Sequence, residues 1–201
     1  MTRVSLLSYG IGNLRSVTRA LEHVGAEVEH ATTAEDVATA EHLVLPGVGA
    51  FSHCAQQLRE RGLWLPIADH LRSDGPFLGI CVGMQLMLDA SEEFGLHDGF
   101  GLIAGRVQRL PEQSGQKVPM VGWKMVENRS GNDIIGEANS FYFVHSFSAE
   151  PEDLSQQIAT YRYGETEITA AVSSGNKLGT QFHPEKSGET GLALLERFVK
   201  S

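Results

Sequence analysis

The sequence predicts an α/β fold: one domain, residues 1–201, with a mostly parallel central sheet flanked by helices and extended by additional antiparallel strands. A chain of 201 residues is the size of one ordinary domain and can bury a core without disulfides or metals. Apolar runs alternate with helical patterns in the first half, as in crossover units that feed a parallel sheet. After Gly95 the pattern changes to short β-branched and aromatic segments broken by glycines.

In the first half, expected strands alternate with amphipathic or helix-forming segments. The expected strands are Arg3–Tyr9, His42–Leu45 and Phe77–Ile80, and the expected helices are Asn13–Val24, Ala50–Arg61 and Val82–Ala90. Gly25 stands where a left-handed helix end would fall. A further strand and helix lie between these elements, and Thr33 and Asp36 are spaced as at a helix start.

The second half predicts shorter, partly antiparallel strands. They are Arg106–Leu110, Gly122–Val126, Phe141–Val144, Ile158–Tyr163, Ile168–Ser174 and Leu178–Phe182. A last amphipathic helix, Gly188–Lys200, is expected to bury Leu192, Leu195 and Phe198. No repeat, low-complexity tract or linker divides the chain.

Composition excludes several classes of partner. Acidic residues outnumber basic ones, 25 against 16, and no basic stripe exists to follow a phosphate backbone, so no nucleic-acid partner is expected. The first residues lack a cationic leader, and no apolar run approaches the roughly 20 residues of a membrane span. We therefore expect a cytoplasmic protein that neither spans nor binds a membrane. Two cysteines, Cys54 and Cys81, are too few for a disulfide framework.

One of these cysteines lies in a motif typical of a catalytic nucleophile. Cys81 is flanked by Gly79 and Gly83 at a predicted strand-to-helix junction, which is the spacing of a nucleophile elbow. A sharp turn there would push the sulfur out of the core and place it at a helix N-terminus, where a thiolate is stabilised. A buried structural cysteine is the commoner alternative. We assign that alternative to Cys54 and the nucleophile to Cys81.

A histidine and a carboxylate end the last predicted strand. His183 and Glu185 are two positions apart, so in an extended chain their side chains share a face. His183 would then act as the base toward Cys81, while Glu185 orients its ring and stabilises the imidazolium. On its own, this pair would be interpreted as a solvated His and Glu in a turn. Together with the nucleophile elbow, the pair predicts a catalytic triad.

A glycine loop after the strand at His42–Leu45 is a candidate oxyanion hole. Gly47 and Gly49 frame Val48, so the N–H of Val48 or Gly49 can turn inward and act with the N–H of Val82. A plain strand-to-helix turn explains this loop equally well.

Other glycine and histidine patterns do not form recognisable sites. The loop Tyr9–Asn13 follows a strand, but Arg15 occupies the third glycine position of the dinucleotide fingerprint. The loop at Val48 lacks the Lys-Ser/Thr ending of a phosphate-binding loop. The eight histidines are scattered, with no His-x-x-x-His or Cys-x-x-Cys spacing, so no metal is expected.

The combined motifs resemble the class I, or triad, glutamine amidotransferases, which have a flavodoxin-like fold. The superfamily resemblance rests on Gly79–Gln85 and His183–Glu185, with Cys, His and Glu in that order. Within it, the additional motifs Gly10–Asn13, Pro46–Gly49, Phe141–Ser146 and Phe182–Ser187 resemble the glutaminase subunits of imidazole glycerol phosphate synthase. The similarity extends from the first strand to the last helix.

The resemblance implies an enzyme that needs no cofactor. Glutamine would be hydrolysed through a γ-glutamyl thioester on Cys81, and the ammonia would pass to a (β/α)₈-barrel cyclase subunit in a heterodimer. The cyclase would use it on a phosphoribulosyl-formimino aminoimidazole carboxamide nucleotide. The products, in histidine biosynthesis, would be imidazole glycerol phosphate and an aminoimidazole carboxamide ribonucleotide, so the complex has hydrolase and lyase activities.

The same resemblance assigns further residues. Gln85 and the main chain at Ser146 and Phe147 would hold the amino and carboxylate ends of glutamine. The partner would face three residues, Trp123, Tyr142 and Lys186.

One segment departs from the family pattern. Family members commonly carry Pro-His-Met-Gly-Trp-Asn where this chain has Met120, Val121 and Lys124 around Trp123. The departure concerns the expected docking surface and favours one alternative, a paralogous glutaminase serving another synthase, such as one that amidinates a surface sugar. Two further alternatives do not depend on it: a stand-alone cysteine hydrolase or peptidase, and a non-catalytic interaction subunit.

Overall fold

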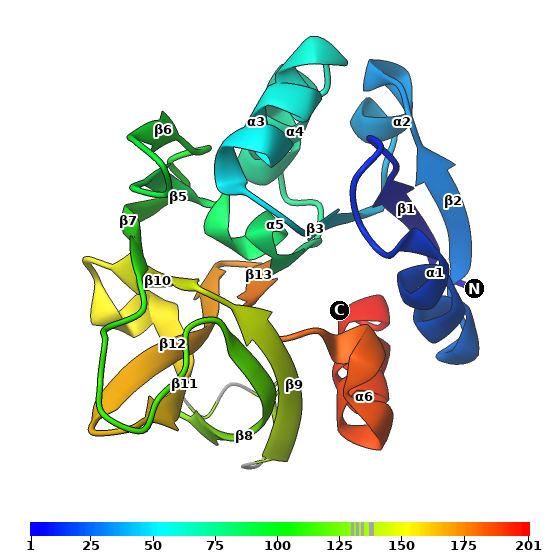
Figure 1. Ribbon diagram of the computed structural model, residues 1–201. Helices are drawn as coiled ribbons and strands as arrows, with labels where there is room; N and C mark the ends of the chain where they lie inside the picture. The colour runs from blue at the N-terminus through cyan, green and yellow to red at the C-terminus, as the bar shows by residue number, and fades with distance from the viewer. Residues whose placement is uncertain (130, 132, 134, 137–138) are drawn as a thin grey trace.

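The computed structural model describes residues 1–129, 131, 133, 135–136 and 139–201. Within this part of the chain the strands form two sheets (Figure 1). The larger has nine strands in the order β2-β1-β3-β4-β13-β12-β11-β8-β9, and the smaller has four in the order β10-β7-β5-β6. Helices flank the larger sheet, which confirms the predicted α/β class.

The elements have the following bounds. The strands are β1 (Arg3–Leu7), β2 (Glu27–Ala31), β3 (His42–Gly47), β4 (Phe77–Cys81), β5 (Leu88–Ser91), β6 (His97–Asp98), β7 (Ile103–Arg109), β8 (Met120–Asn128), β9 (Asn139–His145), β10 (Phe147–Pro151), β11 (Gln157–Tyr163), β12 (Thr166–Ser174) and β13 (Lys177–Thr180). The α-helices are α1 (Leu14–His23), α2 (Ala34–Ala38), α3 (Phe51–Glu60), α4 (Trp64–Arg72), α5 (Val82–Gln85) and α6 (Gly188–Val199). Two short 3₁₀ helices are η1 (Leu154–Gln156) and η2 (Pro184–Lys186).

The parallel half of the larger sheet consists of β2, β1, β3, β4 and β13. Every residue of β3 and β4 is buried, because helices cover both faces, as parallel sheets require. In Figure 1, α1 and α6 lie together on one side of these strands, and α2 and α4 lie together on the other. The predicted capping box at Thr33 and Asp36 begins α2, and Gly25, at φ 91°, follows the end of α1.

The antiparallel half continues the same sheet through β12, β11, β8 and β9. Phe141 and Phe143 of β9 are fully buried, and both pack against Phe182, which follows β13. This packing ties the two halves into one core. The chain then leaves the larger sheet at Ser146 and enters β10 of the smaller one.

The expected helix Val82–Ala90 is wrong beyond its first turn. The α-helix α5 stops at Gln85, and Leu88–Ser91 is strand β5. The carbonyl groups of Leu86 and Met87 accept hydrogen bonds from residues 100–103 instead of from the next helical turn. Strand pairing with the smaller sheet therefore overrides the helix propensity of this segment. The sequence patterns did not predict the helix α4 or the strands β5, β6 and β10.

Three neighbouring parallel strands bring the predicted motifs to one edge. β4 lies between β3 and β13, and all three run in the same direction. The loop at Val48 follows β3, Cys81 ends β4, and His183 follows β13. The carboxyl ends of parallel strands are where α/β folds place their sites. None of the described helices is both long and apolar enough to cross a membrane.

Candidate active site

Cys81 has the strained backbone of a nucleophile elbow. Its φ is 56° and its ψ is −109°, a conformation that residues with a side chain rarely adopt. Such strain persists only where surrounding packing imposes it, and it is concentrated at functional sites. The side chain is only 5% exposed, but it lines a pocket.

Two glycines make the sharp turn possible. A Cβ on Gly79 would lie 2.6 Å from the carbonyl oxygen of Gly83, and a Cβ on Gly83 would overlap the carbonyl oxygen of Leu45. Only glycine fits both positions, as the elbow motif predicts. Because α5 is a single turn, its dipole can stabilise a thiolate less than the longer helix we expected.

His183 and Glu185 form a buried pair beside Cys81. The imidazole donates from Nδ1 to Oε1 of Glu185 at 2.9 Å, and each side chain is 2% exposed. The contact arises differently from the prediction, since Glu185 lies in the 3₁₀ turn η2 rather than in an extended chain. Ser187 fixes this turn by donating to the carbonyl of His183 and accepting from the N–H of Tyr142.

The electrostatics of the pair favour an imidazolium. Burial lowers the pKa of His183, but the Cys81 sulfur and the Glu185 carboxylate outweigh it and raise the pKa to about 10. Nε2 is buried and lacks a direct hydrogen-bond partner among the described residues. This nitrogen is thus available to exchange a proton at the sulfur.

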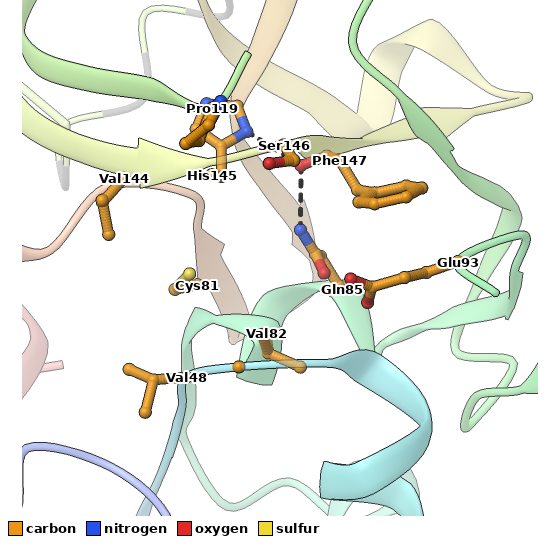
Figure 2. Close-up of a pocket in the computed structure, with 11 residues that line it drawn as sticks. Val48, Cys81, Val82, Gln85, Glu93, Pro119, Val144, His145, Ser146 and Phe147 are labelled. Carbon is orange, nitrogen blue, oxygen red and sulfur yellow. Dashed lines mark hydrogen bonds between the residues drawn. The ribbon is translucent and has the colours of Figure 1, made fainter.

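The pocket next to Cys81 has a volume of about 220 Å³ (Figure 2). This volume accommodates a molecule of the size of an amino acid. The lining contains all the expected oxyanion-hole and glutamine-binding residues, namely Val48, Gly49, Val82, Gln85, Ser146 and Phe147. Gly49 has a φ of 89°, a conformation in which only glycine is unstrained.

Gln85 is held at the wall of this pocket by the Phe147 carbonyl. Its Nε2 donates to that oxygen at 3.0 Å, and His145 Nδ1 lies 2.8 Å from the same oxygen (Figure 2). A carbonyl only accepts, so Nδ1 of His145 carries the proton and Nε2 accepts from the hydroxyl of Tyr161. Burial lowers the pKa of His145 to about 4, which keeps this ring neutral.

Cys54 differs from Cys81 in every respect that matters for reactivity. Its side chain is fully buried in α3, and its thiol donates to the carbonyl of Val48 at 3.5 Å. Burial raises its pKa to about 11, so the thiol stays protonated at neutral pH. Cys54 is a core residue, as expected.

The three residues expected to face a partner lie together on the surface. Trp123 and Tyr142 are opposite each other on β8 and β9, with ring centroids 6.0 Å apart. Nζ of Lys186 lies 5.9 Å from the Tyr142 ring centroid. Trp123 is 54% exposed, and the neighbouring apolar residues Val121 and Met125 are 55% and 58% exposed.

The departures at Met120 and Lys124 lie away from these rings. Residues alternate between faces along β8, so Met120 and Lys124 share the opposite face from Trp123. Met120 is 7% exposed and pairs with His145, and Lys124 pairs with the fully buried Phe141. By the same alternation, Val121 lies on the face of Trp123, whereas Met120 and Lys124 lie on the opposite face.

Several residues at the site had no role in the prediction: Glu93 and Gln181, together with Pro119, Val144 and His145 of the pocket lining. Glu93 lines the pocket and accepts from the N–H of Phe51 at 2.7 Å. Gln181 lies within hydrogen-bond distance of the Cys81 sulfur, at 3.6 Å. Gln181 is adjacent to the His-Pro-Glu motif, which was the available signal. Nothing in the local sequence distinguishes Glu93 from its acidic neighbour Glu92.

No three His, Cys, Asp or Glu side chains of the described residues lie close enough to hold a metal ion. The chemistry available is that of a cysteine nucleophile that lines a pocket, with a buried acid–base histidine and an orienting carboxylate. Such a site forms and hydrolyses an acyl-enzyme.

Comparison with known proteins establishes the family. The model of the family "Glutamine amidotransferase class-I" matches residues 5–201. The chain therefore belongs to the class I glutamine amidotransferases, the class that the fold and the site define.

Curated relatives make the assignment more specific. The chain is 44% identical to "Imidazole glycerol phosphate synthase subunit HisH 1" of Legionella pneumophila (strain Lens), with 100% of both chains covered. It is 45% identical to "Imidazole glycerol phosphate synthase subunit HisH" of Syntrophotalea carbinolica, covering 97% of this chain and 98% of that one. It is also 40% identical to "Imidazole glycerol phosphate synthase hisHF, chloroplastic" of Arabidopsis thaliana, where 98% of this chain matches 34% of that protein.

Solved structures show the same fold at lower identity. The structure of PurLQS from Thermotoga maritima superposes with a TM-score of 0.73 at 23% identity, covering 100% of this chain and 99% of that one. A glutamine amidotransferase crystal structure gives 0.72 at 19% identity, covering 98% and 99%.

Proposed function

We propose that this chain is the glutaminase subunit of imidazole glycerol phosphate synthase, and that it hydrolyses glutamine and delivers the ammonia to a cyclase subunit. The observation that carries the proposal is the buried Cys81, His183 and Glu185 cluster beside a pocket of amino-acid size. The full-length relatives named for that synthase support the choice of reaction.

In the first half-reaction, the Cys81 thiolate attacks the side-chain amide carbon of glutamine. The oxyanion accepts from the N–H of Val82 and from that of Val48 or Gly49. The imidazolium of His183 protonates the departing nitrogen, so ammonia leaves and a γ-glutamyl thioester remains. Glu185 stabilises the imidazolium and fixes the ring.

In the second half-reaction, neutral His183 takes a proton from water as the oxygen attacks the thioester carbon. The carbon–sulfur bond breaks, glutamate leaves, and the proton stays on His183, which restores the thiolate–imidazolium pair. Each turnover thus consumes one water and one glutamine.

The other end of glutamine would be held at the far wall of the pocket. Both hydrogens on Nε2 of Gln85 are used, one by Phe147 and one by Gln181, which leaves its Oε1 to accept from the substrate ammonium. The carboxylate of Glu93 provides an opposite charge there. The main chain at Ser146 and Phe147 would bind the substrate carboxylate.

A partner is chemically necessary because free ammonia at neutral pH is mostly protonated and no longer nucleophilic. We propose a cytoplasmic heterodimer with a (β/α)₈-barrel cyclase that docks on Trp123, Tyr142 and Lys186 and has the lyase activity. In the Arabidopsis relative, the matching part is 34% of a longer chain, so there it is covalently joined to further sequence.

The function is tested by assaying glutamate release with and without the cyclase and its nucleotide ligand. Stimulation by this cyclase is the expected result. Stimulation by a different synthase alone would assign the chain to a paralogous pathway, and full activity without any partner would make it a stand-alone hydrolase.

Replacing Trp123 with alanine is expected to reduce the response to the cyclase by about 10-fold or more. Aromatic residues at the centre of an interface commonly contribute 2 kcal/mol or more when truncated, on the order of a 30-fold change in affinity. The measurement is a titration of glutaminase activity with cyclase. Leu65→Ala, at a side chain 72% exposed on α4, is the matched control. A native response with the Trp123 variant would relocate the interface.

A further inference from the structure

Gln181 follows β13 and lies directly beside the nucleophile. β13 and β4 are parallel and pair Thr180 with Ile80, so the next residues, Gln181 and Cys81, are neighbours across the sheet. Gln181 is fully buried, and its N–H donates to the carbonyl of Ala170 at 2.8 Å. This hydrogen bond fixes the main chain at Gln181, and burial restricts its side chain.

Hydrogen-bond polarity fixes which end of the Gln181 amide faces the sulfur. The Phe147 carbonyl can only accept, so Gln85 must present its NH₂ group to it. That same NH₂ group lies 3.0 Å from Gln181, which must therefore present its carbonyl oxygen, Oε1, to Gln85. The NH₂ group of Gln181 is left to point at Sγ of Cys81, at 3.6 Å.

A hydrogen-bond donor that faces the sulfur of Cys81 stabilises the thiolate more than the thiol. A thiolate accepts hydrogen bonds strongly, whereas a thiol is a weak acceptor and a weak donor. Gln181 is thus a neutral, buried counterpart to the imidazolium of His183, and both residues lie in the segment that follows β13.

We propose that Gln181 is a further catalytic residue, whose side-chain N–H stabilises the Cys81 thiolate and whose carbonyl links that thiolate to Gln85; the inference rests on the proposed glutaminase function. The link also means that the group expected to bind the substrate ammonium and the group that supports the nucleophile share one hydrogen-bond chain.

Two variants separate thiolate support from support of Gln85. Gln181→Leu removes both the donor and the acceptor. Gln181→Glu keeps the acceptor for Gln85 but replaces the NH₂ group with an oxygen. Gln157→Leu is the matched control, because Gln157 donates to Thr169 Oγ1 on the neighbouring strand and has no contact with Cys81.

The probe is iodoacetamide, with the alkylated cysteine identified by peptide mass spectrometry across a pH series on the isolated chain. Alkylation of Cys81 at neutral pH is expected to slow by about 10- to 100-fold in both Gln181 variants, the range for losing a hydrogen bond to a charged group. The pH midpoint of the reaction should move upward. The Gln157 variant should match the wild type.

The outcomes distinguish this inference from the function on which it rests. Native alkylation of Cys81 in Gln181→Glu, with slow glutamine turnover only in Gln181→Leu, would overturn the inference and reduce Gln181 to a support for Gln85. If Gln181→Leu fails to fold, the similarly sized Gln181→Glu variant carries the test alone. If wild-type Cys81 reacts no faster than Cys54, the nucleophile itself is wrong and the proposed function fails.

Discussion

Replacing Cys81 with alanine is expected to abolish glutamate release from glutamine while leaving ammonia-dependent synthesis by the complex intact. Without the sulfur no thioester forms, and removal of a covalent nucleophile costs on the order of 10⁶-fold in turnover. The cyclase active site is on another chain, so added ammonia bypasses the defect. Both activities are measured on the same purified complex.

Cys54→Ala is the matched control for this experiment. Cys54 belongs to the core and does not line the pocket, although its thiol donates to the Val48 carbonyl. Its loss is therefore expected to lower stability and to reduce glutamate release far less than the loss of Cys81. Loss of glutamine- and ammonia-dependent synthesis together in the Cys81 variant would contradict the division of labour between the two chains.

The His183→Ala variant is expected to lose glutaminase activity by roughly 10³- to 10⁶-fold, the range of single triad deletions. His183 acts in both half-reactions, first as the acid toward ammonia and then as the base toward water. Stopped assays of glutamate release measure the loss. A variant with near-native turnover would remove His183 from the mechanism.

The free energy of unfolding of the His183→Ala variant is expected to depend on pH differently from that of the wild type. The pKa of His183 rises from 6.5 to about 10 on folding, despite burial, because of Cys81 and Glu185. Its protonation therefore stabilises the fold fully below pH 6.5, and this stabilisation is lost as the pH rises through 10. Urea unfolding should show the stability difference between wild type and variant shrinking from pH 7 to pH 10. The buried His70, whose pKa is lowered by burial, provides the control variant His70→Gln.

The parallel half of the fold was predictable because its signals are local. Strands β1, β3 and β4 are continuous apolar runs, and the capping box at Thr33 and the turn at Gly25 are set by neighbouring residues. The helix expected at Val82–Ala90 was wrong because the contacts that decide this segment are not local. That segment has helical propensity, but its carbonyls bond to residues 100–103, whose contribution no local window contains.

The site shows the same distinction. Cys81, His183 and Glu185 could be proposed from the sequence because each lies in a motif, and the glycine spacing of the elbow has a steric cause at Gly79 and Gly83. Gln181 was missed because its role depends on Gln85, which is 96 residues away in the sequence. Its function follows from the register of two strands rather than from its own neighbourhood.

Neighbouring residues of β8 lie on opposite faces of the sheet. In the sequence, Met120 and Lys124 are adjacent to the exposed tryptophan and suggest a changed docking surface. In the sheet they lie on the opposite face from Trp123, and Met120 pairs with His145, which lines the pocket. Strand alternation was predictable from the sequence, but which face would be open to a partner was not.

The central claim is that the sulfur of Cys81 becomes acylated by the side chain of glutamine. Rapid quenching with acid during turnover, followed by peptide mass spectrometry, measures this directly. A γ-glutamyl adduct should appear on the Cys81 peptide and not on the Cys54 peptide, and it should accumulate with glutamine but not with glutamate. Glutamine turnover at a steady rate with no adduct on Cys81, or with the adduct on Cys54, would contradict the mechanism.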